Sequence, residues 1–360
     1  MKPKVTTIIA ALIIAVTLMT ACGATDAPAT SMPVQPTQTP IRPTAAPVPE
    51  TTLEPQVTED SVIHRNIPFV PGGNFQQKLS VFLPVEEAGG HGSLYPVVIL
   101  AHGYVYSLED PPLRETMRFL NQLGYAAVTV DYRDDPKSGN PSAALSDVAC
   151  GLAWVYANAD TYGLDVDRMA AFGNSYGAEV VTTLALADEA SQFLTDCPNS
   201  LPDVPPFKGV IPFAAATFGV PGEGLMISSE LGVSFYYGGV HGTETMEEMR
   251  VIQDELSGLT PAEWATSVEL SPEARAFAQT LPAYWVNAGD PPLLLLYPGQ
   301  DSYSQLEYDA FAGLLEAAGA PYTYLVLPDA LHADWGPLGK TDPATWQEPI
   351  QGFLEEIFAE

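Results

Sequence analysis

A serine between two glycines is the first feature of this chain with the means to carry chemistry. The pentapeptide Gly173-Asn174-Ser175-Tyr176-Gly177 follows a short apolar run, residues 168–172, and precedes a longer one, residues 178–187. A strand that turns sharply into a helix exposes such a serine hydroxyl above the end of a sheet, at the N-terminus of the helix. The pattern predicts that Ser175 is a nucleophile. The alternative is an ordinary serine in a strand-to-helix turn.

A serine hydroxyl needs a general base, which the histidines of this chain must supply. The five candidates are His64, His91, His102, His241 and His332. Such a turn resembles that of the α/β-hydrolases, in which the acid and then the histidine follow the serine in the chain, and this order disfavours the first three. His332 lies in a loop between a predicted strand and the last predicted helix, from which it can reach back over the sheet edge. We predict His332 as the base, with His241 as the substitute.

The base in turn needs an acid that orients it, and this acid should follow a strand end between the serine and the histidine. Asp301 follows the apolar run 293–297 and meets this requirement. Asp290 precedes the same run, at the opposite edge of the sheet, and Asp329 stands close in sequence to His332. We predict Asp301 as the acid, with Asp329 left open.

The oxyanion of an acyl-transfer reaction needs two backbone N–H donors. We predict one from Tyr176 and the other from Tyr104, because Gly103 lets the backbone approach there. The alternative for residues 102–104 is a simple turn at a strand end, and His102 itself is expected to be structural. No metal or cofactor is expected, since the sequence has no H-E-x-x-H motif.

Strands alternate with helices from residue 95 onward, which predicts a mostly parallel sheet with helices on both faces. We predict strands at 79–84, 95–101, 125–130, 168–173, 207–213, 292–297 and 322–327, and helices at 112–123, 141–162, 305–318 and 345–358. Residues 217–290 break this alternation and are expected to be a cap insertion with a helical piece at 244–255. Its aromatic residues either line a substrate pocket or, as we favour, pack the insertion: Phe235, Tyr236, Tyr237 and Trp264.

The first 22 residues resemble a bacterial lipoprotein signal. Two lysines precede an apolar stretch that ends in small residues before Cys22. Cleavage before Cys22 would leave it lipidated, which anchors the chain on the extracytoplasmic face of a membrane. A plain secretory peptide or an uncleaved anchor are the alternatives, and both place the rest of the chain outside the cytoplasm. Residues 23–60, rich in Pro and Thr, are expected to be a disordered linker, and 61–360 the folded domain.

The net charge limits the molecules that the protein can bind, and the cysteine content indicates a possible disulfide. With 44 acidic and 14 basic residues the net charge is −30, which excludes nucleic acid and argues against a strongly anionic polymer as substrate. We expect a monomer that meets the membrane through its lipid alone. Once Cys22 is lipidated, Cys150 and Cys197 remain as a possible disulfide in an oxidising compartment, provided that their Cα atoms come within reach.

These motifs together resemble the α/β-hydrolase superfamily over residues 78–358, most closely its esterase and acetyl-esterase branch, which includes dienelactone-hydrolase-like proteins. The resemblance rests on residues 101–103, 131–133, 147–148, 162–168, 173–177 and 289–292, and on Asp301 and His332. It implies the α/β-hydrolase fold and ester hydrolysis through an acyl-enzyme on Ser175. The chain departs from the family in having His102-Gly103-Tyr104-Val105 in place of His-Gly-Gly-Gly, and in its longer cap.

The sequence therefore predicts a serine carboxylesterase for small or carbohydrate-linked acyl esters. A peptidase or amidase with the same triad is one alternative, since Ser175-Tyr176 resembles prolyl-oligopeptidase-type enzymes. No propeller-sized region precedes the domain, however. A catalytically inactive hydrolase fold that acts as a binding protein is the other alternative.

Overall fold

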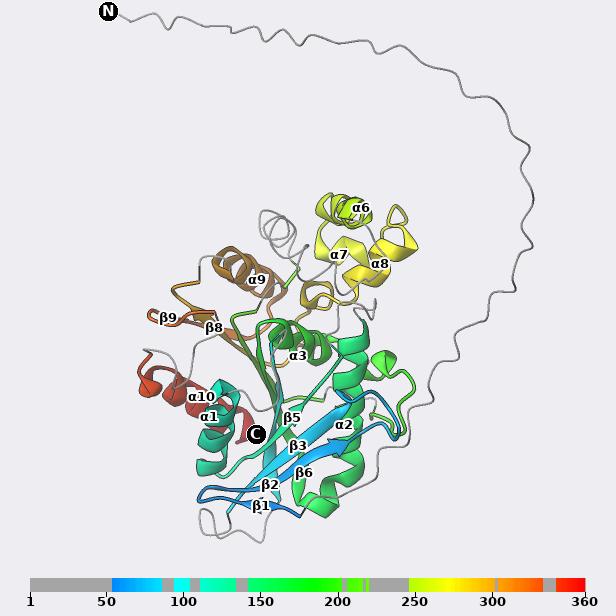
Figure 1. Ribbon diagram of the computed structural model, residues 1–360. Coiled ribbons are helices and arrows are strands. Elements are labelled where there is room, and N and C mark those ends of the chain that lie inside the picture. Colours follow the sequence, from blue (N-terminus) through cyan, green and yellow to red (C-terminus); the bar gives the residue numbers. More distant parts are fainter. Residues whose placement is uncertain are drawn as a thin grey trace, which may run out of the picture. The chain divides into compact units, whose positions relative to one another are not determined.

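A mixed sheet organises the part of the chain that the structure, a computed structural model, describes (Figure 1). The described residues are 54–85, 94–103, 111–133, 142–202, 206–215, 218–219, 246–301, 304–332 and 341–359. Within them the sheet has nine strands in the order β1-β2-β3-β5-β4-β6-β7-β8-β9. The strands are β1 (Gln56–Val57), β2 (Ser61–Pro68), β3 (Lys78–Pro84), β4 (Tyr95–Ala101), β5 (Ala126–Val130), β6 (Leu164–Asn174), β7 (Gly209–Phe213), β8 (Leu293–Pro298) and β9 (Tyr322–Leu327).

The strands from β5 across to β9 are parallel, and β1, β2 and β3 pair antiparallel at one side. Every residue of β5, β7 and β8 is buried. This explains why these strands read as continuous apolar runs, since a parallel sheet is covered on both faces. In β4, Val97 and Ile99 belong to one buried cluster, and Val98 and Leu100 to the other.

Helices cover both faces of this sheet, as the alternation predicts (Figure 1). Side chains of α2 (Ser142–Tyr162), α3 (Tyr176–Leu186) and α9 (Ser304–Ala318) pack in the first cluster. Side chains of α1 (Pro111–Gln122) and α10 (Pro343–Phe358) pack in the second. The α10 helix begins where the Asp342 side chain accepts the N–H of Ala344 and Pro343 occupies the first turn. The carboxyl ends of the parallel strands thus share one edge of a rigid platform.

The insertion between β7 and β8 has a small core of its own. It contains α6 (Met246–Ser257), α7 (Pro261–Trp264), α8 (Pro272–Ala278) and the 3₁₀ helix η4 (Pro282–Tyr284). Trp264 is fully buried there, and its indole N–H donates to Leu256 O at 3.1 Å. Trp264 therefore packs the insertion. Phe235, Tyr236 and Tyr237 lie outside the described residues.

The antiparallel strands β1 and β2 are the part of the sheet that the sequence does not predict. Gln56 and Val57 pair with Ile63 and Val62, so β1 falls inside the predicted linker, and the expected domain start at residue 61 is too late. Both residues of β1 are exposed, and polar residues interrupt the apolar pattern of β2, whose pairing also shifts between His64 and Ile67. Neither strand carries the apolar run by which buried strands are found.

Candidate active site

Ser175 lies on a tight turn between β6 and α3, with φ 53° and ψ −123°. Residues with a side chain rarely adopt this conformation. Its N–H donates to Phe213 O in the neighbouring strand at 3.0 Å, which fixes the turn to the sheet. A Cβ atom on Gly173 would lie 2.4 Å from Gly177 O, and one on Gly177 would lie 2.2 Å from His102 O. Both glycines are therefore required by close backbone contacts on either side of the serine.

The loops after β8 and β9 are joined to one another by backbone hydrogen bonds. Gly299 N–H donates to Leu327 O at 2.8 Å, and Gln300 N–H donates to Ala330 O at 3.0 Å. The first loop carries Asp301 and the second carries His332. These bonds bring the predicted acid and base together although 31 positions separate them in the chain.

The three predicted catalytic side chains form one continuous chain of contacts. His332 Nε2 lies 2.8 Å from Ser175 Oγ, and His332 Nδ1 lies 2.6 Å from Asp301 Oδ2. The Asp301 side chain is 3% exposed and that of His332 is 40% exposed. Asn174 Nδ2 donates to His332 O at 3.4 Å and ties the histidine loop to the serine turn. This arrangement can transfer the hydroxyl proton to the imidazole while the carboxylate orients the ring.

The two predicted oxyanion donors differ in what the structure describes. Tyr176 is the first residue of α3, so its N–H belongs to the helix end that attracts negative charge. Tyr104 lies outside the described residues. The strand that leads to it ends beside the serine turn, because Gly177 packs against the backbone of Ala101 and His102.

His102 is held entirely within the protein. Its Nε2 lies 3.0 Å from Asp131 Oδ1, its Nδ1 lies 2.7 Å from Gly103 O, and its ring stacks on Tyr132 with centroids 4.4 Å apart. The Tyr132 hydroxyl donates to His102 O. The side chain has no exposed surface. These contacts agree with the structural role expected for His102 and fix the backbone that precedes the predicted oxyanion loop.

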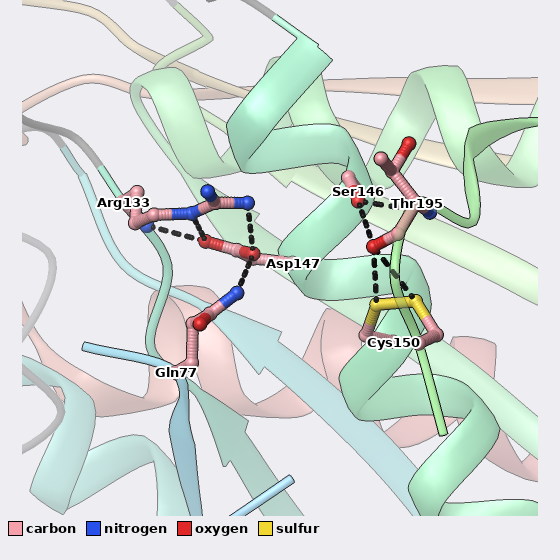
Figure 2. The surroundings of a disulfide bond; sticks show 7 residues. Gln77, Arg133, Ser146, Asp147, Cys150 and Thr195 are labelled. Atoms are coloured by element: carbon pink, nitrogen blue, oxygen red, sulfur yellow. Dashed lines mark hydrogen bonds and ion pairs between the residues drawn. A yellow bond between two sulfur atoms is a disulfide. The ribbon is translucent and has the colours of Figure 1, made fainter. Parts of the chain in front are cut away.

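A buried carboxylate that the sequence analysis did not connect to a partner lies next to this edge (Figure 2). The Asp147 side chain in α2 is fully buried and accepts from Gln77 Nε2 at 2.8 Å. It also accepts from Arg133 Nε at 2.7 Å, Arg133 Nη2 at 2.8 Å and Arg133 N–H at 2.9 Å. Such a bidentate pair fixes the turn after β5 to α2 and to the β2–β3 connection. In the sequence Arg133 is only a basic residue just after a predicted strand end, which does not identify Asp147 as its partner.

Cys150 and Cys197 form a disulfide with a Cα–Cα distance of 5.5 Å (Figure 2). It joins α2 to the segment that follows α3. Beside it, Thr195 N–H donates to Ser146 Oγ at 3.2 Å. The Cα atoms of these two cysteines thus come within reach of a disulfide, which was the condition set for the predicted pairing.

The other two acids that the sequence analysis considered, Asp290 and Asp329, lie in different surroundings from Asp301. The Asp290 carboxylate accepts the backbone N–H and a side-chain N–H of Asn287, both at 2.8 Å, ahead of β8. Burial raises the pKa of Asp290 to about 7, with a further contribution from Asp188, against the opposing effect of the Asn287 hydrogen bond. Asp329 is exposed. His241, the alternative base, lies outside the described residues.

Two further features concern only the described part of the chain. No group of three or more His, Cys, Asp and Glu side chains there is arranged to hold a metal ion. None of its helices combines the length and the apolar character needed to cross a bilayer. Cys22 and the rest of the predicted signal lie outside this part.

The chain is similar to known esterases in sequence. Residues 79–217 match the family model BD-FAE. The chain is 24% identical over 248 residues to the probable carboxylic ester hydrolase LipM of Mycobacterium tuberculosis, covering 68% of this chain and 49% of LipM. It is 30% identical over 124 residues to the esterase LipQ of the same organism, covering 34% of this chain and 28% of LipQ. The chain thus spans half or less of the length of these curated relatives.

Among solved structures, a truncated carbohydrate esterase from gut microbiota has a TM-score of 0.59 at 14% identity, over 86% of this chain and 100% of that one. The protein has the α/β-hydrolase fold, as the sequence predicts. Its parallel sheet, the serine turn before α3 and the order Ser175, Asp301, His332 all agree with that fold.

Proposed function

We propose that the protein is a serine carboxylesterase. One observation carries the proposal: the imidazole of His332 contacts both the Ser175 hydroxyl and the buried Asp301 carboxylate at hydrogen-bond distance. Esterases such as LipM and LipQ support the same reaction class. The serine stands at the carboxyl edge of the parallel strands, where ligands reach α/β folds.

In the proposed reaction His332 Nε2 takes the Ser175 proton as the oxygen attacks the ester carbonyl carbon. The resulting oxyanion is bound by the N–H groups of Tyr176 and Tyr104. The imidazolium then protonates the leaving alcohol, the C–O bond breaks and Ser175 carries the acyl group. Water, deprotonated by His332, attacks the carbonyl carbon of this acyl-enzyme, the bond to Ser175 Oγ breaks, and the imidazolium returns its proton to Ser175 as the acid leaves. Asp301 stays ionised and stabilises the imidazolium throughout.

The proposed substrates are small or carbohydrate-linked acyl esters. The likeness to a carbohydrate esterase is one of fold at 14% identity, so a substrate panel must choose between these two groups. The net charge of −30 favours neutral over strongly anionic substrates. The panel should compare p-nitrophenyl acetate and butyrate, acetylated oligosaccharides, and peptide anilides as the test for amidase activity.

We further propose that the protein works outside the cytoplasm as a monomer anchored by lipid at Cys22. The disulfide between Cys150 and Cys197 supports this location, because such bonds persist in oxidising compartments. In a bacterial host, Cys22→Ser should move the protein from the membrane fraction to the soluble extracytoplasmic fraction. If the variant and the wild type fractionate alike, the anchor is not at Cys22.

Labelling with a fluorophosphonate tests the catalytic proposal directly. The wild type should be modified at Ser175 and lose p-nitrophenyl acetate hydrolysis, and Ser175→Ala should show neither reaction. Ser191 lies in the 3₁₀ helix Ala190–Phe193 and provides a matched control, because Ser191→Ala should leave both reactions unchanged. Labelling of a serine other than Ser175, or equal turnover by Ser175→Ala, would refute the proposal.

A further inference from the structure

The ring of His102 contacts two hydrogen-bond acceptors. Its Nδ1 lies 2.7 Å from the backbone oxygen of Gly103, and its Nε2 lies 3.0 Å from Asp131 Oδ1. A carbonyl oxygen and a carboxylate oxygen accept hydrogen bonds and do not donate them. The His102 side chain has no exposed surface, so both nitrogens must be satisfied by the protein. A neutral imidazole has one N–H and would leave the lone pair of its other nitrogen facing one of these oxygens.

The surroundings of Asp131 favour a carboxylate over a carboxylic acid. The backbone N–H of Tyr132 donates to the same Asp131 Oδ1 at 3.0 Å. This oxygen thus faces two donors, and an ionised carboxylate oxygen can accept from both. A buried ion pair is tolerated where hydrogen bonds satisfy both partners. The second proton of the pair therefore belongs on the imidazole.

The side chain of Tyr132 holds both the ring and the backbone of His102. The two rings stack with centroids 4.4 Å apart and planes 7° from parallel. The face of an aromatic ring carries partial negative charge, so this stacking stabilises a positively charged imidazole more than a neutral one. The Tyr132 hydroxyl donates to His102 O, and the side chain is fully buried.

Other ionisable groups lie on the elements around His102, and none of them forms a hydrogen bond with its ring. Among the described residues only Asp131 forms an ion pair with His102. The others, in β3, after β5, in α2 and at the start of α3, are Lys78, Tyr132, Arg133, Asp147, Tyr176 and Glu179. Arg133 and Asp147 bind each other at 2.7 Å, and Glu179 is buried in the first turn of α3. One carboxylate thus balances the charge on this ring.

The backbone of His102 packs against the nucleophile helix. A Cβ atom on Gly177, in the first turn of α3, would lie 2.2 Å from His102 O. The ring of Tyr176, whose N–H is one predicted oxyanion donor, meets the Tyr132 ring edge to face with centroids 5.9 Å apart. Tyr132 therefore contacts both segments that lead to the predicted donors.

We infer that His102 is a doubly protonated imidazolium, paired with Asp131, which orients and polarises an oxyanion donor. In a planar trans peptide the C=O and the N–H point in opposite directions. The C=O of Gly103 belongs to the same peptide unit as the N–H of Tyr104, the other predicted donor. A charged Nδ1–H that binds this C=O fixes the direction of the unit and strengthens its N–H as a donor. His102 is thus a positioning residue, and this role rests on the proposed function.

NMR of the wild-type protein labelled with ¹⁵N tests the charge without reference to activity. At pH 7 His102 should show two ring N–H signals, and both nitrogen shifts should be those of an imidazolium. The signals are assigned by their loss in His102→Gln, or by their proximity to the Tyr132 ring protons if that variant does not fold. A single ring N–H, with the other nitrogen unprotonated, would overturn the inference.

The substitution Asp131→Asn tests the effect on the oxyanion. It removes the negative partner at nearly constant size, so the ring should keep one N–H, and kcat for p-nitrophenyl acetate should fall about tenfold with little change in KM. This is less than the ~10²–10³-fold cost of losing a whole oxyanion donor. The corresponding thionoester should lose less, because sulfur is a weak hydrogen-bond acceptor.

Asp165→Asn is the matched control. Asp165 also accepts from a cation, Arg168 Nε at 2.7 Å, but at the other end of β6. This variant should retain both ring N–H signals of His102 and the wild-type kcat for ester and thionoester alike.

The outcomes separate this inference from the proposed function. If no form of the protein hydrolyses any ester, the proposed function fails, while the ring N–H signals still test the charge on His102. If the wild type is active and Asp131→Asn lowers kcat equally for the ester and the thionoester, or not at all, the polarising role is wrong. Equal effects of Asp131→Asn and Asp165→Asn would also overturn it.

Discussion

Two histidine–aspartate pairs lie at the carboxyl edge of the same sheet, and only one of them faces a nucleophile. His332 and Asp301 are joined at 2.6 Å, and His102 and Asp131 at 3.0 Å. The second nitrogen of His332 contacts the Ser175 hydroxyl, whereas that of His102 contacts a backbone carbonyl. His332 is 40% exposed and His102 is fully buried. In both pairs a carboxylate orients the imidazole. The partner of the other ring nitrogen decides whether the histidine can act as a base or has a structural role.

Of the substitutions in these two pairs, we expect His332→Ala to lower kcat the most. Replacing it by Ala removes the base, so kcat for p-nitrophenyl acetate should fall by about 10⁶-fold, as for a triad that acts as a unit. Ser175→Ala should lose as much, and the double variant should lose no more than either single one. A His332→Ala enzyme with near wild-type kcat would place the base elsewhere.

Asp301→Asn should cost less than loss of the base, on the order of 10³–10⁴-fold in kcat, because the imidazole is no longer held in the correct tautomer. Asp329→Asn is the matched control, since Asp329 is exposed in the same region and should leave kcat unchanged. Steady-state kinetics of both variants check this. The assignment is wrong if the two effects are reversed.

The other pair should affect stability more than chemistry. His102→Ala leaves the Asp131 carboxylate without its imidazole partner in a buried position, which should lower the free energy of unfolding by about 1–3 kcal/mol. Urea unfolding measures this change, and kcat should fall far less than in His332→Ala. Unchanged stability with a collapse of kcat would mean that His102 takes part in the chemistry.

The smallest effect concerns the support of the acid. The buried Tyr297 hydroxyl donates to Asp301 O at 2.8 Å. Tyr297→Phe should cost about 0.5–1.5 kcal/mol, which corresponds to a loss of up to about tenfold in kcat/KM if the bond acts on catalysis. Tyr324→Phe is the control, because its hydroxyl binds the exposed side chain of Asp309. Equal effects from the two tyrosines would remove Tyr297 from the support of the acid.

Much of the scaffold is readable from the sequence. Continuous apolar runs predict β4 and β9 at the bounds observed, and the other parallel strands within a few residues. Strands buried on both faces leave this signal because nearly every position must be apolar, whereas in β9, at the edge of the sheet, only Leu327 is buried. β1 and β2 leave none, since they are short or interrupted by polar residues at the side of the sheet.

Part of the candidate site can also be predicted from the sequence. The glycines around Ser175 mark a turn that tolerates no side chain, and chain order selects the acid and the base. The partners of Asp147 and the burial of Glu179 are not readable. Each depends on a second element far away in the chain, and an acidic residue in the first turn of a helix is usually a solvated one.

By itself, the sequence determined which residues could carry out catalysis and their order in the chain: a serine on a strained turn, then an acid, then a histidine. Tertiary structure decided which side chains meet, because backbone bonds between the loops after β8 and β9 set the distance from Asp301 to His332. It also decided which acidic groups lose their solvent. Distance and solvation arise from contacts between remote segments, so neither can be read along the chain alone.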